Sequence, residues 1–198
     1  MQIEPATLED ARGIAEVHVA SWQRAYQNIL PEQYLADLSI ERREKMWREA
    51  LEKQLPQLLV ARSENRTVGF VAFGASRDDG AKPGSAEIWA VYLLPEVWSQ
   101  GVGRMLWQAA LERMVAEGFN TVSLWVISTN ERAIRFYLDA GFVPEPGSLK
   151  EFELGGVLLK EIRYVFSCPG QGLSERPHSD QRPVQPQSED DPRHGADH

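Results

Sequence analysis

Apolar residues in the first 167 positions of the chain repeat with two different spacings, whereas residues 168–198 show neither spacing. Thr7 and Asp10 resemble a helix N-cap with an acidic first turn, and apolar residues then recur at helical spacing through Val17. Pro31 and Ser39 predict the starts of two shorter helices. The N-terminal part of the chain is therefore predicted to be mostly helical.

Strand-like apolar runs begin near residue 58 and alternate with further helical segments. The predicted strands are 2–4, 58–61, 67–75, 86–94, 121–127, a strand from 142–143 extending toward 152, and 157–166. One helix is predicted after the glycines at 101 and 103, with Gly118 as its C-cap, and another at 130–140, closed by Gly141. This order of elements predicts a mixed α/β domain.

The composition changes at residue 168. Five prolines follow, and the only aliphatic residues larger than alanine are Leu173 and Val184. Such a segment buries too little apolar surface to offset the entropy lost on ordering. We therefore predict one domain, residues 1–167, followed by a disordered, proline-rich polar tail, residues 168–198.

Net charge and cysteine content exclude several classes of protein. A net charge of −8 argues against a general nucleic-acid binder and weakly favours a cationic small partner. The single cysteine, Cys168, excludes a disulfide within the chain and any CxxC pair, and no metal site is predicted.

The N-terminus lacks the features of a signal peptide, and no apolar run approaches the roughly 20 residues of a membrane span. We expect a cytoplasmic protein that binds neither membranes nor nucleic acids.

The segment Gln100-Gly101-Val102-Gly103 joins a predicted strand to a predicted helix. Its glycines allow positive φ angles, and the first amides of the helix lack intrahelical partners, which suits a pyrophosphate. A plain strand–helix connection explains the turn equally well. The dinucleotide fingerprint fails because position 106 is leucine, and no Walker lysine follows, so a nucleotide-binding oxidoreductase is disfavoured.

Three stretches taken together resemble the GNAT acetyltransferases. The segment 98–103 matches the family's [R/Q]-x-x-G-x-[G/A] at both glycines and departs from it at Trp98. The segment 130–142 is similar to N-x-x-A-x-x-x-Y-x-x-x-G-F at every fixed position. Ala86-Glu87-Ile88 resembles the segment in which some histone acetyltransferases of the family place a catalytic glutamate.

This resemblance implies a GNAT acyl-CoA N-acyltransferase fold. A central, mostly antiparallel sheet carries a splayed parallel strand pair and is flanked by helices. Acetyl-CoA would be the acyl donor, without a metal. Backbone groups of Val91, Tyr92 and Leu93 would pair with the pantetheine amides, and the Asn130 side chain would bind the pantetheine arm. The pyrophosphate would be held by amides of Ser99, Gln100, Gly101, Val102, Gly103 and Arg104.

The same resemblance assigns roles in the chemistry. Tyr137 would protonate the departing thiolate, because a phenol is neutral at pH 7 and can donate its proton. The alternative is that Tyr137 is an aromatic residue of the core without a catalytic role. Either Glu87 or a water chain would take the proton of the amine. Strand alternation places Glu87 on one face with Trp89 and Val91. Alternatively, Glu87 is only a polar residue at the start of the strand. Relatives that acetylate protein N-termini often have a glutamate where this chain has Trp125.

The acceptor side of such enzymes is usually formed by the first two helices and the last hairpin. Trp22 and Tyr26, four apart on one helical face, and also Tyr34 and Trp89, are candidates to line it, or else they are core. His18 is interpreted as structural.

The predicted function is transfer of an acetyl group from acetyl-CoA to a primary amine of a small molecule or peptide, by direct attack in a ternary complex. The alternative is a non-catalytic acyl-CoA-binding or regulatory module of the same fold. An exposed final strand would permit a homodimer.

Overall fold

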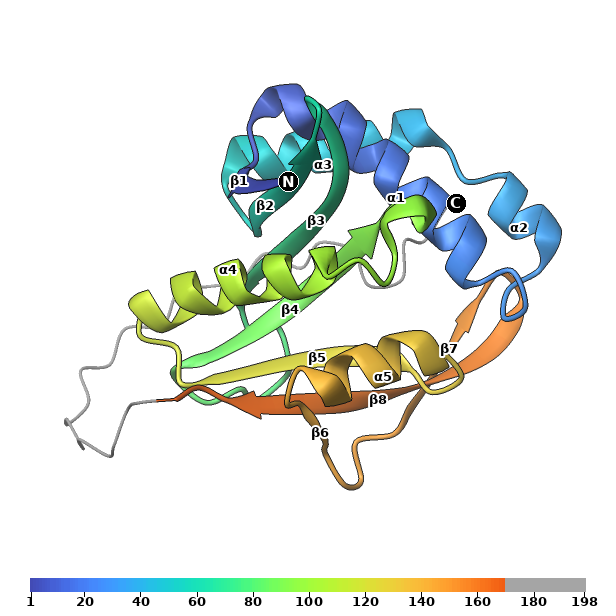
Figure 1. The fold of residues 1–198 in the computed structure, drawn as a ribbon. Coiled ribbons are helices and arrows are strands. Elements are labelled where there is room, and N and C mark those ends of the chain that lie inside the picture. Colours follow the sequence, from blue (N-terminus) through green and yellow to red (C-terminus); the bar gives the residue numbers. More distant parts are fainter. Residues whose placement is uncertain (170–198) are drawn as a thin grey trace.

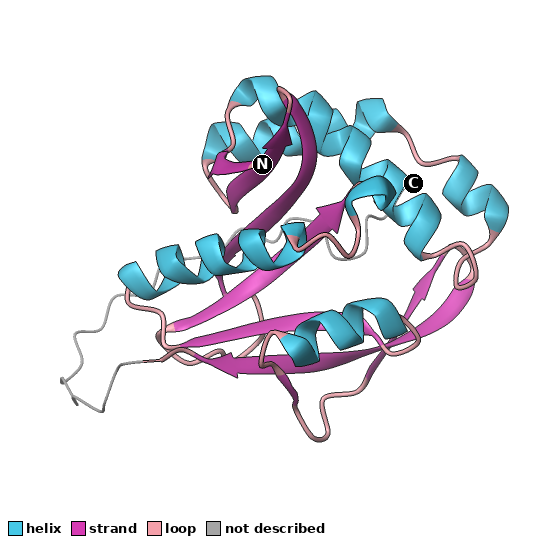
Figure 2. Ribbon diagram, in the orientation of Figure 1, coloured by secondary structure: helices cyan, strands magenta, loops and turns pink. Residues whose placement is uncertain are grey.

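The computed structural model describes residues 1–169, which form one mixed sheet with helices packed on it (Figures 1 and 2). Its strands are β1 Gln2–Pro5, β2 Gln57–Ser63, β3 Arg66–Ala75, β4 Ser85–Leu93, β5 Thr121–Ile127, β6 Val143–Pro144, β7 Lys150–Leu154 and β8 Val157–Ser167. Its α-helices are α1 Ala11–Ala25, α2 Glu32–Ala36, α3 Ile40–Lys53, α4 Val102–Ala116 and α5 Glu131–Asp139, with short 3₁₀ turns η1 Leu8–Asp10 and η2 Pro95–Val97. Nearly all of the predicted tail, residues 170–198, lies outside the described residues.

The strands follow the order β1-β2-β3-β4-β5-β8-β6, and β7 also pairs with β8. Within residues 1–169, β4 and β5 are the one parallel pair, and their pairing is limited to Ser85–Glu87 with Thr121–Ser123. Beyond that point the two strands diverge, as Figure 1 shows. The predicted fold class, a mostly antiparallel sheet with a splayed parallel pair and flanking helices, is confirmed.

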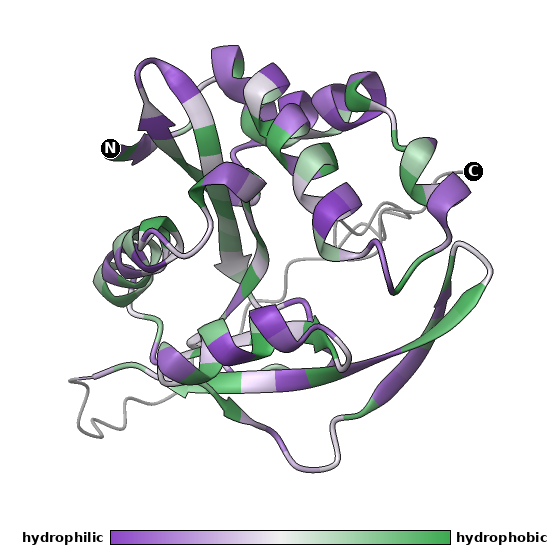
Figure 3. Ribbon diagram, turned by 45° about the vertical axis from the view of Figure 1, so that its right-hand side comes forward, coloured by the Kyte–Doolittle hydropathy of each residue, from purple (hydrophilic) through white to green (hydrophobic). Residues whose placement is uncertain are grey.

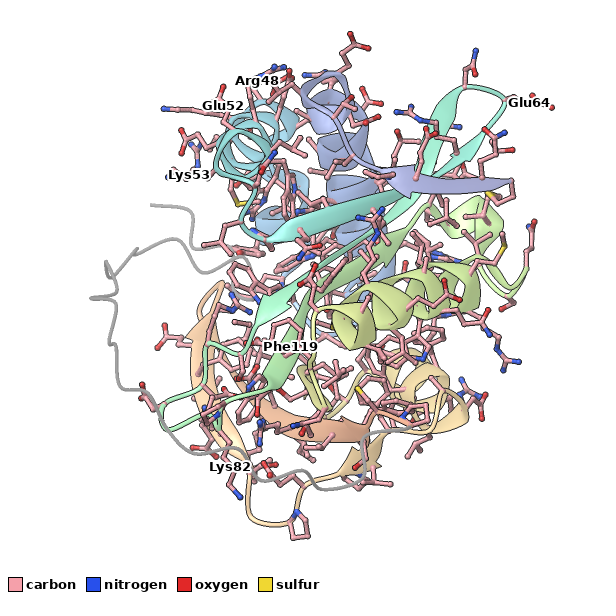
Figure 4. The ribbon with its side chains drawn as sticks, turned by 90° about the vertical axis from the view of Figure 1, so that its left-hand side faces the viewer. Arg48, Glu52, Lys53, Glu64, Lys82 and Phe119 are labelled. Atoms are coloured by element: carbon pink, nitrogen blue, oxygen red, sulfur yellow. The ribbon has the colours of Figure 1, made fainter. Side chains whose placement is uncertain are left out.

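Helices cover both faces of the sheet, with α1 and α3 packed on one side of β2 and β3 and α4 on the other (Figure 4). The outer surface of α3 carries Arg48, Glu52 and Lys53, which point away from the sheet. The inner surface of α3 presents Trp47, and α4 presents Leu106; both side chains are almost fully buried. Burial of these apolar stripes fixes α3 and α4 against opposite faces of the sheet.

Local capping signals explain where several elements begin and end. The Ser39 hydroxyl accepts a hydrogen bond from the Arg42 amide at 3.2 Å and caps α3. At the first helix, the Asp10 carboxylate accepts the Thr7 amide at 2.8 Å, so η1 comes first and α1 begins only at Ala11. The β2–β3 hairpin tip, which Glu64 marks, is hydrophilic (Figure 3).

The chain after α5 differs from its prediction. A single strand from Phe142 toward Phe152 is wrong, because β6 and β7 are separate short strands. Pro144 and Pro146 lack the amide that a strand ladder needs, and the Ser148 hydroxyl donates to the Glu145 carbonyl at 2.7 Å to close a turn.

The final strand is also not the exposed edge that the sequence predicts. β8 lies between β5 on one side and β6 and β7 on the other, so the edges of the sheet are β1 at one end and β6 with β7 at the other. No helix within residues 1–169 is both long and apolar enough to cross a membrane.

Candidate active site

The divergence of β4 and β5 opens a cleft of about 730 Å³. Its walls come from six sources: β4, β5, the η2–α4 turn, α5, the end of α1, and the β7–β8 hairpin. Among the described residues, no strand pairs with the β5-facing edge of β4 beyond Glu87, so main-chain groups of this edge face the cleft. Val91, Tyr92 and Leu93, the predicted pantetheine partners, all line it.

The η2–α4 turn contributes free amides to this cleft. Gly101 has a φ of 83° and caps α4, whose first hydrogen bond runs from the Met105 amide to the Gly101 carbonyl at 3.1 Å. The amides of Val102, Gly103 and Arg104 therefore lack partners within the helix. A Cβ atom added at Gly101 would meet nothing within 4 Å. This open, amide-lined helix start has the geometry of an anion site.

Not all six residues predicted for the pyrophosphate present side chains to the cleft. Ser99, Gly101, Gly103 and Arg104 line it, whereas Gln100 and Val102 do not. The Gln100 side chain donates to the Glu96 carbonyl at 2.7 Å, and Val102 is 2% exposed in the core. These two residues have only their backbone to offer.

Three arginines beside the turn line the cleft: Arg104, Arg132 and Arg135. Arg132 and Arg135 are not predicted from the sequence, because they occupy variable positions of the motif. The Arg132 guanidinium lies over the Trp98 ring, 4.5 Å from its centroid, and donates to the Ser99 hydroxyl at 3.4 Å. Arg132 thus brings a cation to the site where the family's arginine or glutamine is replaced by Trp98.

Trp98 also binds the C-terminal end of β4. Its indole N–H donates to the Leu93 carbonyl at 2.9 Å. Leu93 is one of the predicted pantetheine partners, and its carbonyl therefore already accepts a hydrogen bond. The ring joins β4 to the turn while it supports Arg132 on its face.

Tyr26, Tyr92 and Tyr137 lie close enough together in the cleft to influence one another. Burial raises the pKa of Tyr137 well above its ordinary value, and Tyr92 raises it further. Burial also raises the pKa of Tyr26 strongly, against a hydrogen bond from the Asn130 side chain. Both phenols are therefore neutral near pH 7 and able to donate a proton.

Asn130 performs two tasks at the start of α5. Its Oδ1 accepts the Ala133 amide at 3.2 Å, which caps the helix, and its side chain also bonds to the Tyr26 phenol. The helix thus presents Asn130 to the cleft one turn ahead of Ala133 and two turns ahead of Tyr137.

Glu87 does not lie where the sequence analysis places it. β3 pairs Ala72 with Ala90 but the next residue, Phe73, with Ile88, so Trp89 is an extra residue that bulges out of the ladder. The bulge breaks the simple alternation, and the shared face expected for Glu87, Trp89 and Val91 is wrong.

The Glu87 side chain is instead fully buried and bound by Arg77. The Arg77 guanidinium donates to Oε1 at 2.6 Å, and its backbone amide donates to Oε2 at 2.9 Å. Glu87 is not among the residues that line the cleft. The same guanidinium lies 3.9 Å from the centre of the Trp89 ring, so the pair fastens the bulge to the β3–β4 loop.

We expect Glu87→Gln to lower the free energy of unfolding by about 2 kcal/mol, since it removes the charge that several donors of Arg77 share. Urea unfolding measures this loss. Glu96→Gln, which breaks the exposed pair with Arg66, is the control and should cost less than about 0.5 kcal/mol. A large loss of turnover in folded Glu87→Gln, rather than of stability, would return the general-base role to Glu87.

The opposite half of the cleft is aromatic. The predicted residues Trp22, Tyr26 and Trp89 all line it. Trp22 is only 2% exposed and packs edge-on against Tyr26, with ring centroids 5.0 Å apart, so it is largely core. Within residues 1–169, the indole N–H groups of Trp22 and Trp89 are buried without a hydrogen-bond partner. Tyr34 does not line the cleft and packs against Gly155.

Strands β5, β7 and β8 add residues to this half that the sequence analysis did not assign to the acceptor: Trp125, Phe152, Leu154 and Glu161. Trp125 donates from its indole to Asp78 at 2.8 Å, and the Lys150 ammonium lies 3.8 Å from the centre of its ring. A single sequence does not show which residues of a late hairpin reach a cleft, because this depends on strand register.

His18 lies in the core beside this half, as interpreted from the sequence. Its Nδ1 accepts the Trp47 indole N–H at 3.1 Å, and its ring stacks on Tyr92 with centroids 4.8 Å apart. Burial lowers the pKa of His18 well below its ordinary value, so it is neutral near pH 7.

Comparison with known proteins places the chain among acetyltransferases. Residues 19–142 match the Acetyltransferase (GNAT) family. An uncharacterized N-acetyltransferase of Bacillus subtilis (strain 168), YuaI, is 37% identical over 161 residues, which cover 81% of this chain and 89% of that protein.

Solved structures of acetyltransferases share the fold. The PaiA N-acetyltransferase of Thermoplasma acidophilum, solved in complex with coenzyme A, has a TM-score of 0.62 at 24% identity. The match covers 81% of this chain and 98% of that chain. YncA of Salmonella typhimurium, solved with its cofactor acetyl-CoA, has a TM-score of 0.67 at 20% identity and covers 88% of this chain and 98% of its own.

Proposed function

The chain belongs to the GNAT family and is an N-acetyltransferase, and we propose that it transfers the acetyl group of acetyl-CoA to a primary amine of a small molecule or peptide. The amine attacks the thioester directly, with donor and acceptor held together in one cleft. The observation that carries this proposal is the split between β4 and β5, which joins an open strand edge and the free amides at the start of α4 to an aromatic pocket.

The residues present fit acetyl-CoA. The free amides at the start of α4, with Arg104 and Arg132 beside them, suit a pyrophosphate. The open edge of β4 at Val91–Leu93 suits the pantetheine amides as an added strand. The Nδ2 group of Asn130 carries two N–H donors, so beside its hydrogen bond to the Tyr26 phenol it has a second donor to offer to the same arm, while Oδ1 caps the helix. When bound, acetyl-CoA supplies the acetyl thioester.

We assign the proton transfers to groups that line the cleft and to water. We assign to Tyr137 the donation of a proton to the leaving sulfur, since its raised pKa keeps the phenol protonated. We assign the stabilisation of the oxyanion to a main-chain amide of β4. A water chain takes the proton of the amine, because Glu87 is bound to Arg77 away from the cleft.

The alternative is a non-catalytic acyl-CoA-binding module. Membership of an enzyme family and the joint presence of Asn130 and Tyr137 in the cleft favour catalysis. Release of free thiol from acetyl-CoA in the presence of a panel of primary amines tests the choice. Tight binding of acetyl-CoA with no turnover of any amine would favour the binding module.

We assign the activity to a domain of residues 1–167, with the predicted tail outside it. A homodimer remains a prediction, and in the described part of the chain it would have to pair through β1 or through β6 and β7, the edges of the sheet.

We expect Arg132→Ala to raise the KM for acetyl-CoA by about 10-fold, because a cation beside the phosphates contributes on the order of 1–2 kcal/mol when partly exposed. The effect should shrink with added salt. Steady-state kinetics at low and high ionic strength measure it. Arg113→Ala, on the exposed surface of α4 and outside the cleft, is the matched control. An unchanged KM in both variants would remove Arg132 from the phosphate site.

A further inference from the structure

A second cavity, of about 240 Å³, lies beside the main cleft, and we call it the side cavity. Its walls come from the end of α1 with the loop that follows, from Trp98 in the η2–α4 turn, and from the start of α5. Ala25, Trp98, Asn130 and Arg132 line both the side cavity and the main cleft. The side cavity therefore borders the half of the cleft that contains the glycine turn.

The side cavity carries positive charge. Arg24 from α1 and Arg132 from α5 both line it, and none of its lining residues is acidic. Its other polar side chains are neutral amides, from Gln27, Asn28 and Asn130. Two cations that line one small cavity repel each other, whereas an anion bound in the cavity would attract both. The charge of the lining therefore favours an anionic ligand.

Within residues 1–169, the printed contacts of these two guanidinium groups are all with neutral groups. Arg24 donates to the side-chain oxygen of Gln27 at 3.1 Å. Arg132 donates to the Ser99 hydroxyl at 3.4 Å and lies over the Trp98 ring. A guanidinium has five N–H donors, so these contacts hold both side chains in place and leave further donors for a ligand.

Other exposed arginines of the described chain are bound by carboxylates, for example Arg48 by Glu44 and Arg66 by Glu96. Arg24 lies in the last turn of α1, where the helix dipole favours a cation. The dipole accounts for a cation at this position, but it does not account for the second cation, Arg132, across the same cavity. A shared anion accounts for both.

We propose that the side cavity is a second anion site, in which Arg24 and Arg132 bind a phosphate or carboxylate group of a ligand that occupies the main cleft. Guanidinium groups bind both kinds of anion through charge-assisted hydrogen bonds. This inference rests on the proposed function, since its ligands are those of acetyl transfer.

Two ligands of the proposed reaction can supply the anion. One is acetyl-CoA, whose ribose carries a phosphate in addition to the pyrophosphate. The other is an acceptor amine with an anionic substituent. We expect the ribose phosphate, because Trp98 and Arg132 belong both to the side cavity and to the surroundings of the glycine turn.

The first experiment compares coenzyme A with dephospho-coenzyme A, which differ only by the ribose phosphate, by calorimetry with wild type and Arg24→Ala. We expect wild type to bind coenzyme A about 10-fold more tightly, and Arg24→Ala to lose most of this difference, as for loss of exposed hydrogen bonds to a charged group. Added salt should reduce the difference. Arg113→Ala removes an exposed arginine from the last turn of α4, outside both cavities, and should keep the wild-type difference.

The second experiment tests the acceptor as the source of the anion. Binding of ethanolamine and of phosphoethanolamine is measured by calorimetry with the protein saturated with coenzyme A. Preference of wild type for phosphoethanolamine, lost in Arg24→Ala, would support the anion site with the acceptor as its ligand. The inference is overturned if wild type distinguishes neither pair of compounds, or if Arg24→Ala leaves each difference unchanged.

Failure of the inference and failure of the proposed function give different results. Both experiments measure binding, so a difference that Arg24→Ala abolishes supports the anion site even if no amine is acetylated. Acetylation of an amine without any such difference would overturn the anion site while the proposed function stands. Arg24 is exposed, so its replacement should leave the fold intact. Arg24→Lys, which keeps the charge without the planar fork, should retain part of the difference.

Discussion

Tyr137→Phe should lower the turnover number by about 10²-fold, within the range for loss of one general acid. The phenol lies in the cleft where β4 and β5 have diverged, and its pKa is raised by burial and by Tyr92, so it is protonated whenever the enzyme works. Phenylalanine keeps the ring contacts with Phe136 and Phe142 and removes only the proton donor. Steady-state kinetics should show the loss in kcat, with the affinity for acetyl-CoA nearly unchanged.

The pH dependence sharpens this expectation. Because the pKa of Tyr137 is raised rather than lowered, its proton is present throughout the range from about pH 6 to 9, where an ordinary phenol is also protonated. The ratio of wild-type to variant turnover should therefore stay constant across that range. Tyr164→Phe, which removes a buried phenol of β8 outside the cleft, is the control. Equal turnover by wild type and Tyr137→Phe would exclude Tyr137 as the acid.

Gly103→Leu should lower kcat/KM for acetyl-CoA by about 10²-fold, the scale of effect that a displacement of about 1 Å can have on a positioned group. A Cβ at Gly103 would lie 3.2 Å from the Phe136 ring and 3.3 Å from the Leu93 side chain. The new side chain therefore meets the wall between α4, α5 and β4. Overpacking there pushes the free amides of α4 away from their places.

Gly101→Ala separates this effect from backbone strain. Gly101 has a φ of 83° and open space around it, so alanine there costs about 1–2 kcal/mol of conformational energy without a collision. We expect a lower melting temperature and a much smaller loss of acetyl-CoA affinity than in Gly103→Leu. Isothermal titration with acetyl-CoA measures the affinity. Wild-type affinity in Gly103→Leu would show that the packing of Gly103 does not set the phosphate site.

Elements and motifs were predictable from the sequence because their signals are local. The spacing of apolar residues located the strands and helices, and β5 was predicted with the bounds that it has. Gly118 and Gly141 end α4 and α5 at φ angles of 88° and 93°, as their positions predict. The segment after Phe142 was mispredicted because its prolines interrupt an apolar pattern that otherwise reads as one strand.

Side-chain neighbours were less predictable, because they depend on pairings between distant segments. The bulge at Trp89 is visible only in the register of β3 against β4, and it separates Glu87 from the face that alternation assigns to it. Arg132 reaches the glycine turn by stacking on Trp98, which is more than thirty residues away in the chain.

By itself, the sequence determined the mixed α/β class, the family and the glycine turn at the start of α4. It also determined that Asn130 begins the helix that carries Tyr137. The family came from the resemblance of three stretches to known motifs, whereas the other features rest on spacing along a few turns or one strand, where backbone geometry alone fixes which residues are neighbours. Only the tertiary structure decided that Glu87 is bound to Arg77 and that Glu161 faces the cleft. A shift of one residue in register moves a side chain to the other face of a sheet, and register is set by the whole packed core.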